Sequence, residues 1–226
     1  MRAKICISVA ADTVPKLIGL IEKAESLGAD LIEVRFDYLN VIGEVKRVAK
    51  STPIPIIATN RRYDQGGGKK QDEERRIQTL LEASMYGFEF VDVELVTPNL
   101  TSIIERIRDL GSEVIVSHHI FDGTPPQEEM ERLIKVMISK GAHICKLVTT
   151  AESFNDNIAC LNVVKKMSKD VRVVCFAMGE KGLLSRVLSP IVGGYFTYAS
   201  LSEGSEVAPG QLSFEFLKNL YEALGV

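Results

Sequence analysis

A lysine stands in the middle of an apolar segment of the chain, "HICKLVTT", residues 143–150. Isoleucine, cysteine, leucine and valine flank Lys146, so the segment has the composition of a short buried strand. An ammonium ion seldom lies in such surroundings unless it is paired or used. Three uses are open: an ion pair with Glu33 or Glu94, binding of a substrate anion, and attack on a ketone by the neutral amine that burial favours.

Charged side chains also alternate with apolar ones in the segment "LIEVRFD", residues 31–37. Glu33, Arg35 and Asp37 share one face of this strand candidate, because every second residue of a strand points the same way. The apolar face is expected to meet helices, which leaves the charged face to point into a barrel. A solvated charged face is the weaker interpretation, because both faces of a parallel sheet are covered.

Other strand candidates end in polar residues as well, as catalytic groups do in barrel enzymes. The residues concerned are Arg61, Arg62, Asp92, Glu94, Ser117 and His119. His119 shares a face with Ser117 and is the candidate acid or base, since imidazole titrates near neutral pH. His118 and His143 are expected to be structural. No ligand spacing supports a metal site.

Strand-like and helix-like patterns alternate from end to end, which predicts right-handed βαβ units and a parallel sheet. The eight strand candidates are 4–10, 31–37, 54–60, 88–95, 113–119, 143–150, 171–177 and 195–200. Helical spacing is clearest at 13–28, 73–86, 126–140 and 211–224. Eight units in 226 residues predict a single-domain (β/α)8 TIM barrel spanning residues 1–226, with a doubly wound open sheet as the alternative. The glycine-rich loops 63–76 and 202–211 follow strand ends, where active-site loops of a barrel lie.

Composition excludes several classes of partner. The net charge is −3, so there is no basic excess to bind nucleic acid or anionic lipid. The longest apolar runs are strand-sized, and the first residues lack the pattern of a signal peptide. We therefore expect a cytoplasmic protein. The four cysteines are expected to be small buried hydrophobic residues, not disulfides or metal ligands.

Five short motifs, in order along essentially the whole chain, resemble those of the type I 3-dehydroquinate dehydratases, Schiff-base enzymes of the shikimate pathway. "EVRFD" (33–37) resembles the family's E-x-R-x-D strand, and "SHHIFDGTP" (117–125) its S-x-H-x-F-x-x-T-P segment. "CKLV" (145–148) resembles the segment that holds the imine lysine. "SR" (185–186) and "APGQ" (208–211) match two late motifs.

The resemblance implies that Lys146 forms an imine with the C3 ketone of 3-dehydroquinate and that His119 moves the protons of the dehydration. It implies five residues that bind the substrate: Glu33, Arg35 and Arg61 at the ring hydroxyls, and Arg186 and Gln211 at the carboxylate end. The loops 63–70 and 202–210 would close over the site. Neither a cofactor nor a metal is expected, because the lysine supplies the electron sink. The resemblance also implies a homodimer and a role in aromatic amino acid biosynthesis, although quinate breakdown uses the same reaction.

Two positions depart from the family pattern. Gln65 stands where the family usually has a glutamate before a glycine pair, and Val207 where a small hydroxyl residue often precedes "APGQ". The resemblance does not explain Asp92 and Glu94, which are expected to support Lys146 or His119 electrostatically or to form a structural ion pair.

Two other functions share these features in part. A class I aldolase would also use a buried lysine, but "VGGY" (192–195), the one candidate phosphate site, precedes the last strand instead of following it. A non-catalytic barrel that binds a cyclitol or sugar acid would need neither an amine such as Lys146 nor a base such as His119.

Overall fold

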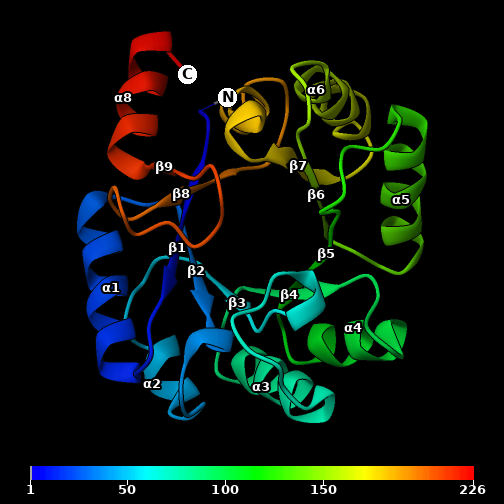
Figure 1. Ribbon diagram of the computed structural model, residues 1–226. Helices are drawn as coiled ribbons and strands as arrows, with labels where there is room; N and C mark the ends of the chain where they lie inside the picture. Colours follow the sequence, from blue (N-terminus) through cyan, green and yellow to red (C-terminus); the bar gives the residue numbers. More distant parts are fainter. Residues whose placement is uncertain (1) are drawn as a thin grey trace.

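Eight parallel strands surround a central axis and helices form a ring outside them in the computed structural model, which describes residues 2–226 (Figure 1). The strands are β1 (Ile5–Ala10), β2 (Leu31–Arg35), β3 (Ile56–Thr59), β4 (Phe90–Glu94), β5 (Glu113–His119), β6 (Ile144–Thr150), β7 (Arg172–Met178) and β8 (Thr197–Ser200). The predicted fold class, a (β/α)8 barrel, is confirmed, and the doubly wound alternative was wrong.

The helices follow the strands in sequence and pack on their outer faces. They are α1 (Val14–Leu27), α2 (Val45–Ala49), α3 (Glu73–Met85), α4 (Leu100–Asp109), α5 (Gln127–Ser139), α6 (Asn155–Met167), α7 (Leu183–Leu188) and α8 (Phe214–Leu224). Short 3-10 turns η1 (Phe36–Tyr38), η2 (Tyr63–Gln65) and η3 (Glu180–Gly182) follow β2, β3 and β7. Within residues 2–226, every helix is too short or too polar to span a bilayer.

The hydrogen-bonded ladder runs in the order β7-β6-β5-β4-β3-β2-β1-β8 and all of its pairs are parallel. Between β7 and β8 the ladder is interrupted. A main-chain hydrogen bond from Tyr195 N–H to Val173 O, 2.8 Å long, joins the chain before β8 to β7. Helix α7 packs against both of these strands. The side of the barrel next to α7 is therefore joined more loosely than the rest.

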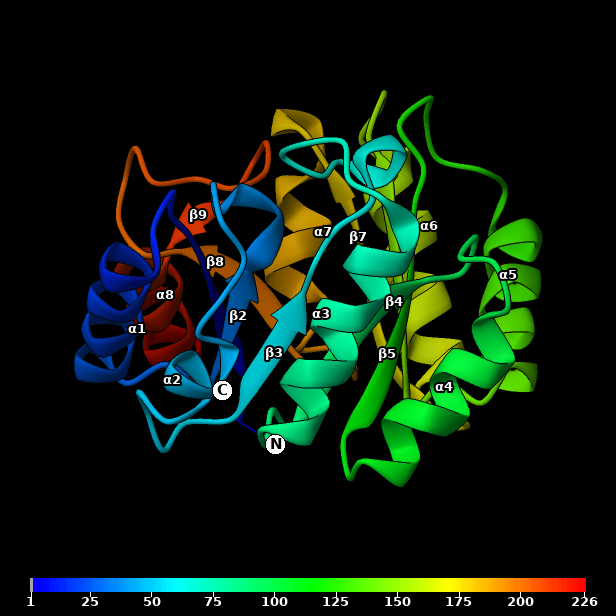
Figure 2. The same ribbon diagram turned by 90° about the horizontal axis from the view of Figure 1, so that it is seen from below.

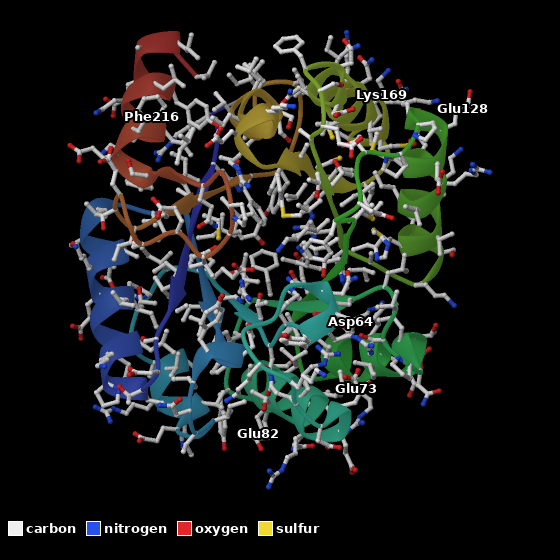
Figure 3. All side chains as sticks on the ribbon, viewed as in Figure 1. Asp64, Glu73, Glu82, Glu128, Lys169 and Phe216 are labelled. Carbon is white, nitrogen blue, oxygen red and sulfur yellow. The ribbon has the colours of Figure 1, made fainter. Side chains whose placement is uncertain are left out.

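Alternation along the strands separates two cores. One face of the strands packs against the helices, and Ile32, Val34 and Phe36 belong to this outer core, as predicted. The other face fills the barrel with a smaller cluster that includes Ile144, Val148, Phe176 and Tyr198. The sticks in Figure 3 fill the centre of the ring, while Glu82, Glu128, Lys169 and Phe216 lie at its outer rim. The barrel is thus a packed core whose polar groups gather at one end.

The strands point toward one end of the barrel, and both chain termini lie at the other end (Figure 2). The loops after β3 and β8 rise at the carboxyl end of the strands, where the sequence places them. Catalytic groups of TIM barrels lie at this end.

Several predicted boundaries differ from the structure by one to three residues, and two of these differences place residues in another kind of element. The helix predicted from residue 211 begins at Phe214, because Leu212–Ser213 forms a ninth strand, β9, which pairs with β8. The Ser213 side chain then caps α8 by accepting a hydrogen bond from Phe216 N–H. The strand predicted to reach residue 37 ends at Arg35, and Asp37 lies in η1.

Candidate active site

A cavity of about 110 Å³ opens at the carboxyl end of the barrel. All seven site residues that the sequence predicts line it: Glu33, Arg35, Arg61, His119, Lys146, Arg186 and Gln211. They come from β2, β5 and β6, from the loops after β3 and β8, and from α7, so the fold alone brings them together. A larger hollow of about 940 Å³ lies outside the barrel between α3 and α4 and contains none of them.

Lys146 lies at the centre of β6 with its amine inside the barrel, and only 4% of the residue is exposed. Its Nζ lies 3.0 Å from Asp92 Oδ2, 3.4 Å from Glu33 Oε1 and 3.0 Å from Tyr198 Oη. Of the uses left open for this lysine, the ion pair is present, with Glu33 and Asp92 and not with Glu94. An ammonium with three acceptors is fully hydrogen-bonded, which explains how the charge is tolerated in an apolar strand.

Asp92 and Glu94 form a buried ion-pair network with two arginines, one of which, Arg61, lines the cavity. Arg61 donates to Asp92 at 2.8 and 2.6 Å and to Glu94 at 3.0 Å, and Arg76 lies 2.8 Å from Glu94. Burial alone raises the pKa of the Asp92 carboxyl, but Arg61 and Lys146 outweigh burial and hold that pKa far below its ordinary value. Asp92 is therefore the anion that joins Arg61 to Lys146, whereas Glu94 joins the two arginines.

Glu33 is held by two neighbours that the sequence did not single out, whereas Arg35 is held by Asp37, which belongs to the same sequence motif. Ser8 and Thr59 donate to Glu33 at 2.7 and 3.0 Å. Burial raises the pKa of Glu33, but Lys146, Arg35 and Arg61 overcome it, so the net effect is a lowered pKa. Arg35 donates twice to Asp37, and this leaves its Nη1 without an acceptor among residues 2–226. Arg35 can therefore still donate to a ligand.

His119 ends β5, and its imidazole Nδ1 is buried without a hydrogen-bond partner among the described residues. Burial, aided by the positive charges of Arg61 and Lys146, lowers the pKa of His119 well below 6.5. The imidazole is thus neutral near pH 7. The ring stacks on Phe121, with centroids 6.3 Å apart.

Gln65, one of the two departures from the family pattern, holds the main chain of His119. Its side-chain oxygen accepts from His119 N–H at 2.8 Å, and its Nε2 lies 3.4 Å from His119 O. The Gln65 carboxamide thereby fastens the loop after β3 to the end of β5. A glutamate in its place could accept the first bond but could not donate the second.

Arg186 reaches the cavity from α7, beside the interrupted ladder. It is buried, its guanidinium lies 4.2 Å from the Phe176 ring, and its one hydrogen bond goes to Pro209 O at 3.3 Å. With no acidic side chain paired to it among residues 2–226, burial lowers the pKa of Arg186 to about 10. A buried arginine with unused donors is a site for an anion.

The loop after β8 forms the remaining wall of the cavity. Gln211 accepts from Val207 N–H at 2.8 Å, which leaves its amide NH2 available. Val207, the second departure, contributes a side chain without a hydroxyl to the wall. The contact with a ligand at this position is therefore apolar.

His143 and the cysteines are structural, as predicted. His143 Nδ1 accepts from Val114 N–H at 3.0 Å, and all four cysteines are buried free thiols. No group of three His, Cys, Asp or Glu side chains within residues 2–226 could hold a metal ion. His118 lies on the face of β5 opposite to His119 and is half-buried.

Tyr198 is a site residue that sequence reasoning missed. It lines the cavity and touches Lys146, yet in "YFTYAS" it stands beside Phe196 and has the pattern of a core aromatic residue. Its position two residues after Phe196, on the inward face of a barrel strand, was the available signal.

The chain is similar to known proteins over almost its whole length. A model of the type I 3-dehydroquinase family matches residues 5–226. The 3-dehydroquinate dehydratase of Dehalococcoides mccartyi is 39% identical over 213 residues, which cover 92% of this chain and 94% of that protein. The Methanopyrus kandleri enzyme of the same name is 34% identical over 225 residues, 98% of this chain and 100% of that protein.

Solved structures are similar over the same length. The crystal structure of type I 3-dehydroquinate dehydratase from Clostridium difficile, with covalent modified comenic acid, has a TM-score of 0.89 and 26% identity. The similarity covers 99% of this chain and 92% of that one.

Proposed function

The chain belongs to the type I 3-dehydroquinase family, and we propose that it dehydrates 3-dehydroquinate through an imine on Lys146. It is a 3-dehydroquinate dehydratase, a hydro-lyase. The covalent route and the role of each residue are the proposal. The observation that carries it is the buried amine of Lys146, in one cavity with the neutral imidazole of His119 and the guanidinium of Arg186, which pairs with no carboxylate among residues 2–226.

Substrate binding starts from the carboxylate. Arg186 offers a planar pair of donors, and no carboxylate among residues 2–226 pairs with it. A bound substrate carboxylate would therefore give the arginine back the interactions that it lost on burial. The amide NH2 of Gln211 is available at the same wall. Glu33, Arg35 and Arg61 face the ring hydroxyls. Because Arg61 is bound to Asp92 and Glu94, it acts mainly by fixing these two carboxylates beside Lys146.

Imine formation uses the neutral amine of Lys146. The ammonium gives up a proton, for which the neutral His119 is an acceptor in the same cavity. The nitrogen lone pair forms a bond to C3, the carbonyl pair moves to oxygen, and that oxygen is protonated and leaves as water. The product is a positively charged iminium beside the carboxylates of Asp92 and Glu33. Fixed negative charges at this place stabilise it without reorganisation.

Elimination then follows at C2 and C1. His119 removes the C2 proton, and the C–H electron pair forms an enamine while the C=N pair returns to nitrogen. The enamine expels the C1 hydroxyl, which takes the proton held by His119 and leaves as water. The C1=C2 double bond forms and the iminium is restored. Water then hydrolyses the iminium, and 3-dehydroshikimate and Lys146 are released.

We also propose the biological setting. The reaction fits the shikimate pathway of aromatic amino acid biosynthesis, in the cytoplasm, with residues 1–226 as one catalytic domain. The family resemblance supports a homodimer, which analytical ultracentrifugation of the purified chain tests. A monomeric sedimentation coefficient at micromolar concentration would contradict it.

Borohydride trapping tests the imine. The protein is incubated with 3-dehydroquinate, reduced, and analysed intact and as peptides by mass spectrometry. We expect a reduced adduct on Lys146 that is absent in Lys146→Ala, and we expect Lys166→Ala, a surface control, to keep it. Enone absorbance that rises without an adduct would overturn the imine route. Neither adduct nor enone product would overturn the function.

A further inference from the structure

Tyr198 holds a hydroxyl at a fixed place beside the reacting amine. The Tyr198 residue is 3% exposed, and its ring packs edge-on against Phe196 and Phe176, with centroids 5.1 and 6.3 Å away. Its Oη lies 3.0 Å from Lys146 Nζ, and Nζ lies 4.3 Å from the ring centroid. The two aromatic neighbours and β8 leave the side chain little freedom, so the hydroxyl is positioned before a substrate arrives.

The hydrogen bonds of Lys146 leave one neighbouring donor, the O–H of Tyr198, without an acceptor among residues 2–226. The ammonium has three N–H bonds, and its three acceptors are Glu33, Asp92 and Tyr198. Tyr198 thus accepts, and its own O–H has no acceptor among residues 2–226. Burial keeps that hydrogen in place, because it raises the pKa of Tyr198 well above 10. Since Tyr198 lines the cavity, a substrate oxygen is the remaining partner.

We propose that Tyr198 is a further catalytic residue, whose hydroxyl donates a hydrogen bond to the C3 oxygen of the substrate while the imine forms and while it is hydrolysed. This inference rests on the imine route proposed above. After attack by Lys146, the nitrogen and the former carbonyl oxygen share one carbon, so a hydroxyl next to the nitrogen reaches that oxygen.

The electrons and protons of the step balance without net transfer from Tyr198. The carbonyl pair moves to oxygen as the N–C bond forms, and the oxygen takes the proton that the nitrogen loses. In the second half the C–O bond breaks with its electron pair, the oxygen takes the proton that His119 received from the Lys146 ammonium and leaves as water, and the nitrogen lone pair forms the C=N bond. Tyr198 stabilises the negative charge that develops on oxygen in both halves and keeps its own proton.

The test compares Tyr198→Phe with Tyr221→Phe. The first variant removes only the hydroxyl and keeps the ring. The control removes an equally buried hydroxyl, which donates to Val187 O at 2.8 Å and lies outside the cavity. Rapid mixing with 3-dehydroquinate, followed by a borohydride quench and mass spectrometry, measures how fast the adduct on Lys146 appears. We expect Tyr198→Phe to slow it by at least about tenfold, as loss of one preorganised donor does, and Tyr221→Phe to leave it unchanged.

A second measurement separates catalysis from packing. With substrate deuterated at C2, slower imine formation makes proton abstraction less rate-limiting, so the isotope effect on kcat/KM falls in Tyr198→Phe. A displaced cavity that slows every step would leave the isotope effect unchanged and would overturn the inference.

The failures of the two proposals are distinguishable. Wild-type protein that forms no adduct contradicts the imine route itself. Wild-type protein that forms an adduct no faster than Tyr198→Phe contradicts only the role of Tyr198. Should Tyr198→Phe not fold, 3-fluorotyrosine at position 198 keeps the shape and strengthens the donor. Faster adduct formation is then expected, and an unchanged rate would overturn the inference.

Discussion

Two buried cations in one cavity have opposite surroundings, and the difference separates their proposed roles. Lys146 has two carboxylates within 3.4 Å, whereas among residues 2–226 the Arg186 guanidinium has only a main-chain oxygen and an aromatic ring beside it. The fixed anions beside Lys146 suit a group that stays positively charged as an iminium. The missing anion beside Arg186 suits a group whose partner arrives with the substrate.

Replacement of Arg186 tests this difference at the level of one residue. Arg186→Lys keeps a positive charge but loses the planar fork, so KM for 3-dehydroquinate should rise while kcat changes less. Loss of a charge-assisted bond costs about 1.5–3 kcal/mol, or about 10- to 150-fold in kcat/KM. The rate of enone formation measures both constants. A Lys variant with the wild-type KM would place the substrate carboxylate elsewhere.

The two adjacent histidines of β5 provide a matched pair. His119→Asn should lower kcat by about 10²- to 10⁴-fold, since it removes the proposed acid and base, whereas His118→Asn, on the opposite face, should keep kcat within a few-fold.

Because burial and neighbouring cations lower the pKa of His119, the imidazole loses activity by protonation only below pH 6.5. The acidic limb of the kcat/KM profile should therefore lie below pH 6.5. An acidic limb above pH 7 would contradict this assignment.

At the scale of elements, the loop after β3 is fastened to the barrel from three directions. Gln65 binds the main chain of His119, Gly66 O accepts from Arg35 at 3.2 Å, and Gly68 N–H donates to Asp37 at 2.9 Å. Only glycine fits at position 67, because a Cβ there would overlap the main-chain oxygens of Arg61 and Arg62. The loop thereby presents Gln65 and Gly66 to the cavity.

Gln65→Glu tests what the departure from the family pattern does. The carboxylate keeps the bond from His119 N–H, loses the bond to His119 O, and places a negative charge near the imidazole. A nearby anion favours the imidazolium, so the acidic limb of kcat/KM should move to higher pH than in wild type. Gln78→Glu, the same change at an exposed position on α3, should leave the profile unchanged. Identical profiles for wild type and Gln65→Glu would mean that this loop does not set the protonation of His119.

Sequence reasoning located the strands and most of the site because alternation in a barrel strand is a local property. Glu33, Lys146 and His119 could be assigned a face from the residues next to them. Gln65 and Tyr198 could not, since their roles depend on contacts across 54 and 52 residues of chain. The same reason explains β9, where pairing with β8 overrides the helical spacing of residues 211–224.

At the scale of the molecule, a chain of buried charges of alternating sign crosses the carboxyl end of the barrel. Contacts join Arg76, Glu94, Arg61, Asp92, Lys146 and Glu33 in that order, and Arg35 pairs with Asp37 beside them. The four cations and four carboxylates balance when Lys146 carries its positive charge. A protonated imine carries the same charge, so the reaction proposed above passes through its covalent intermediate without a change in this balance.

The stability of the whole barrel should therefore depend on Asp92 and on pH. Asp92→Asn leaves Arg61 and Lys146 without their shared anion, which we expect to lower the free energy of unfolding by about 3–5 kcal/mol at pH 7. Because the folded protein holds the pKa of Asp92 below 3.8, its contribution is complete above about pH 5 and is lost as pH falls below 4 toward the lowered pKa. Urea unfolding at several pH values measures this dependence. As pH falls below 4, the free energy of unfolding should decrease more for wild type than for Asp92→Asn. Asp12→Asn, which breaks an exposed pair with Lys16, is the control and should follow wild type at every pH. Parallel curves for wild type and Asp92→Asn between pH 5 and pH 2 would show that the acid sensitivity of the barrel comes from other carboxylates.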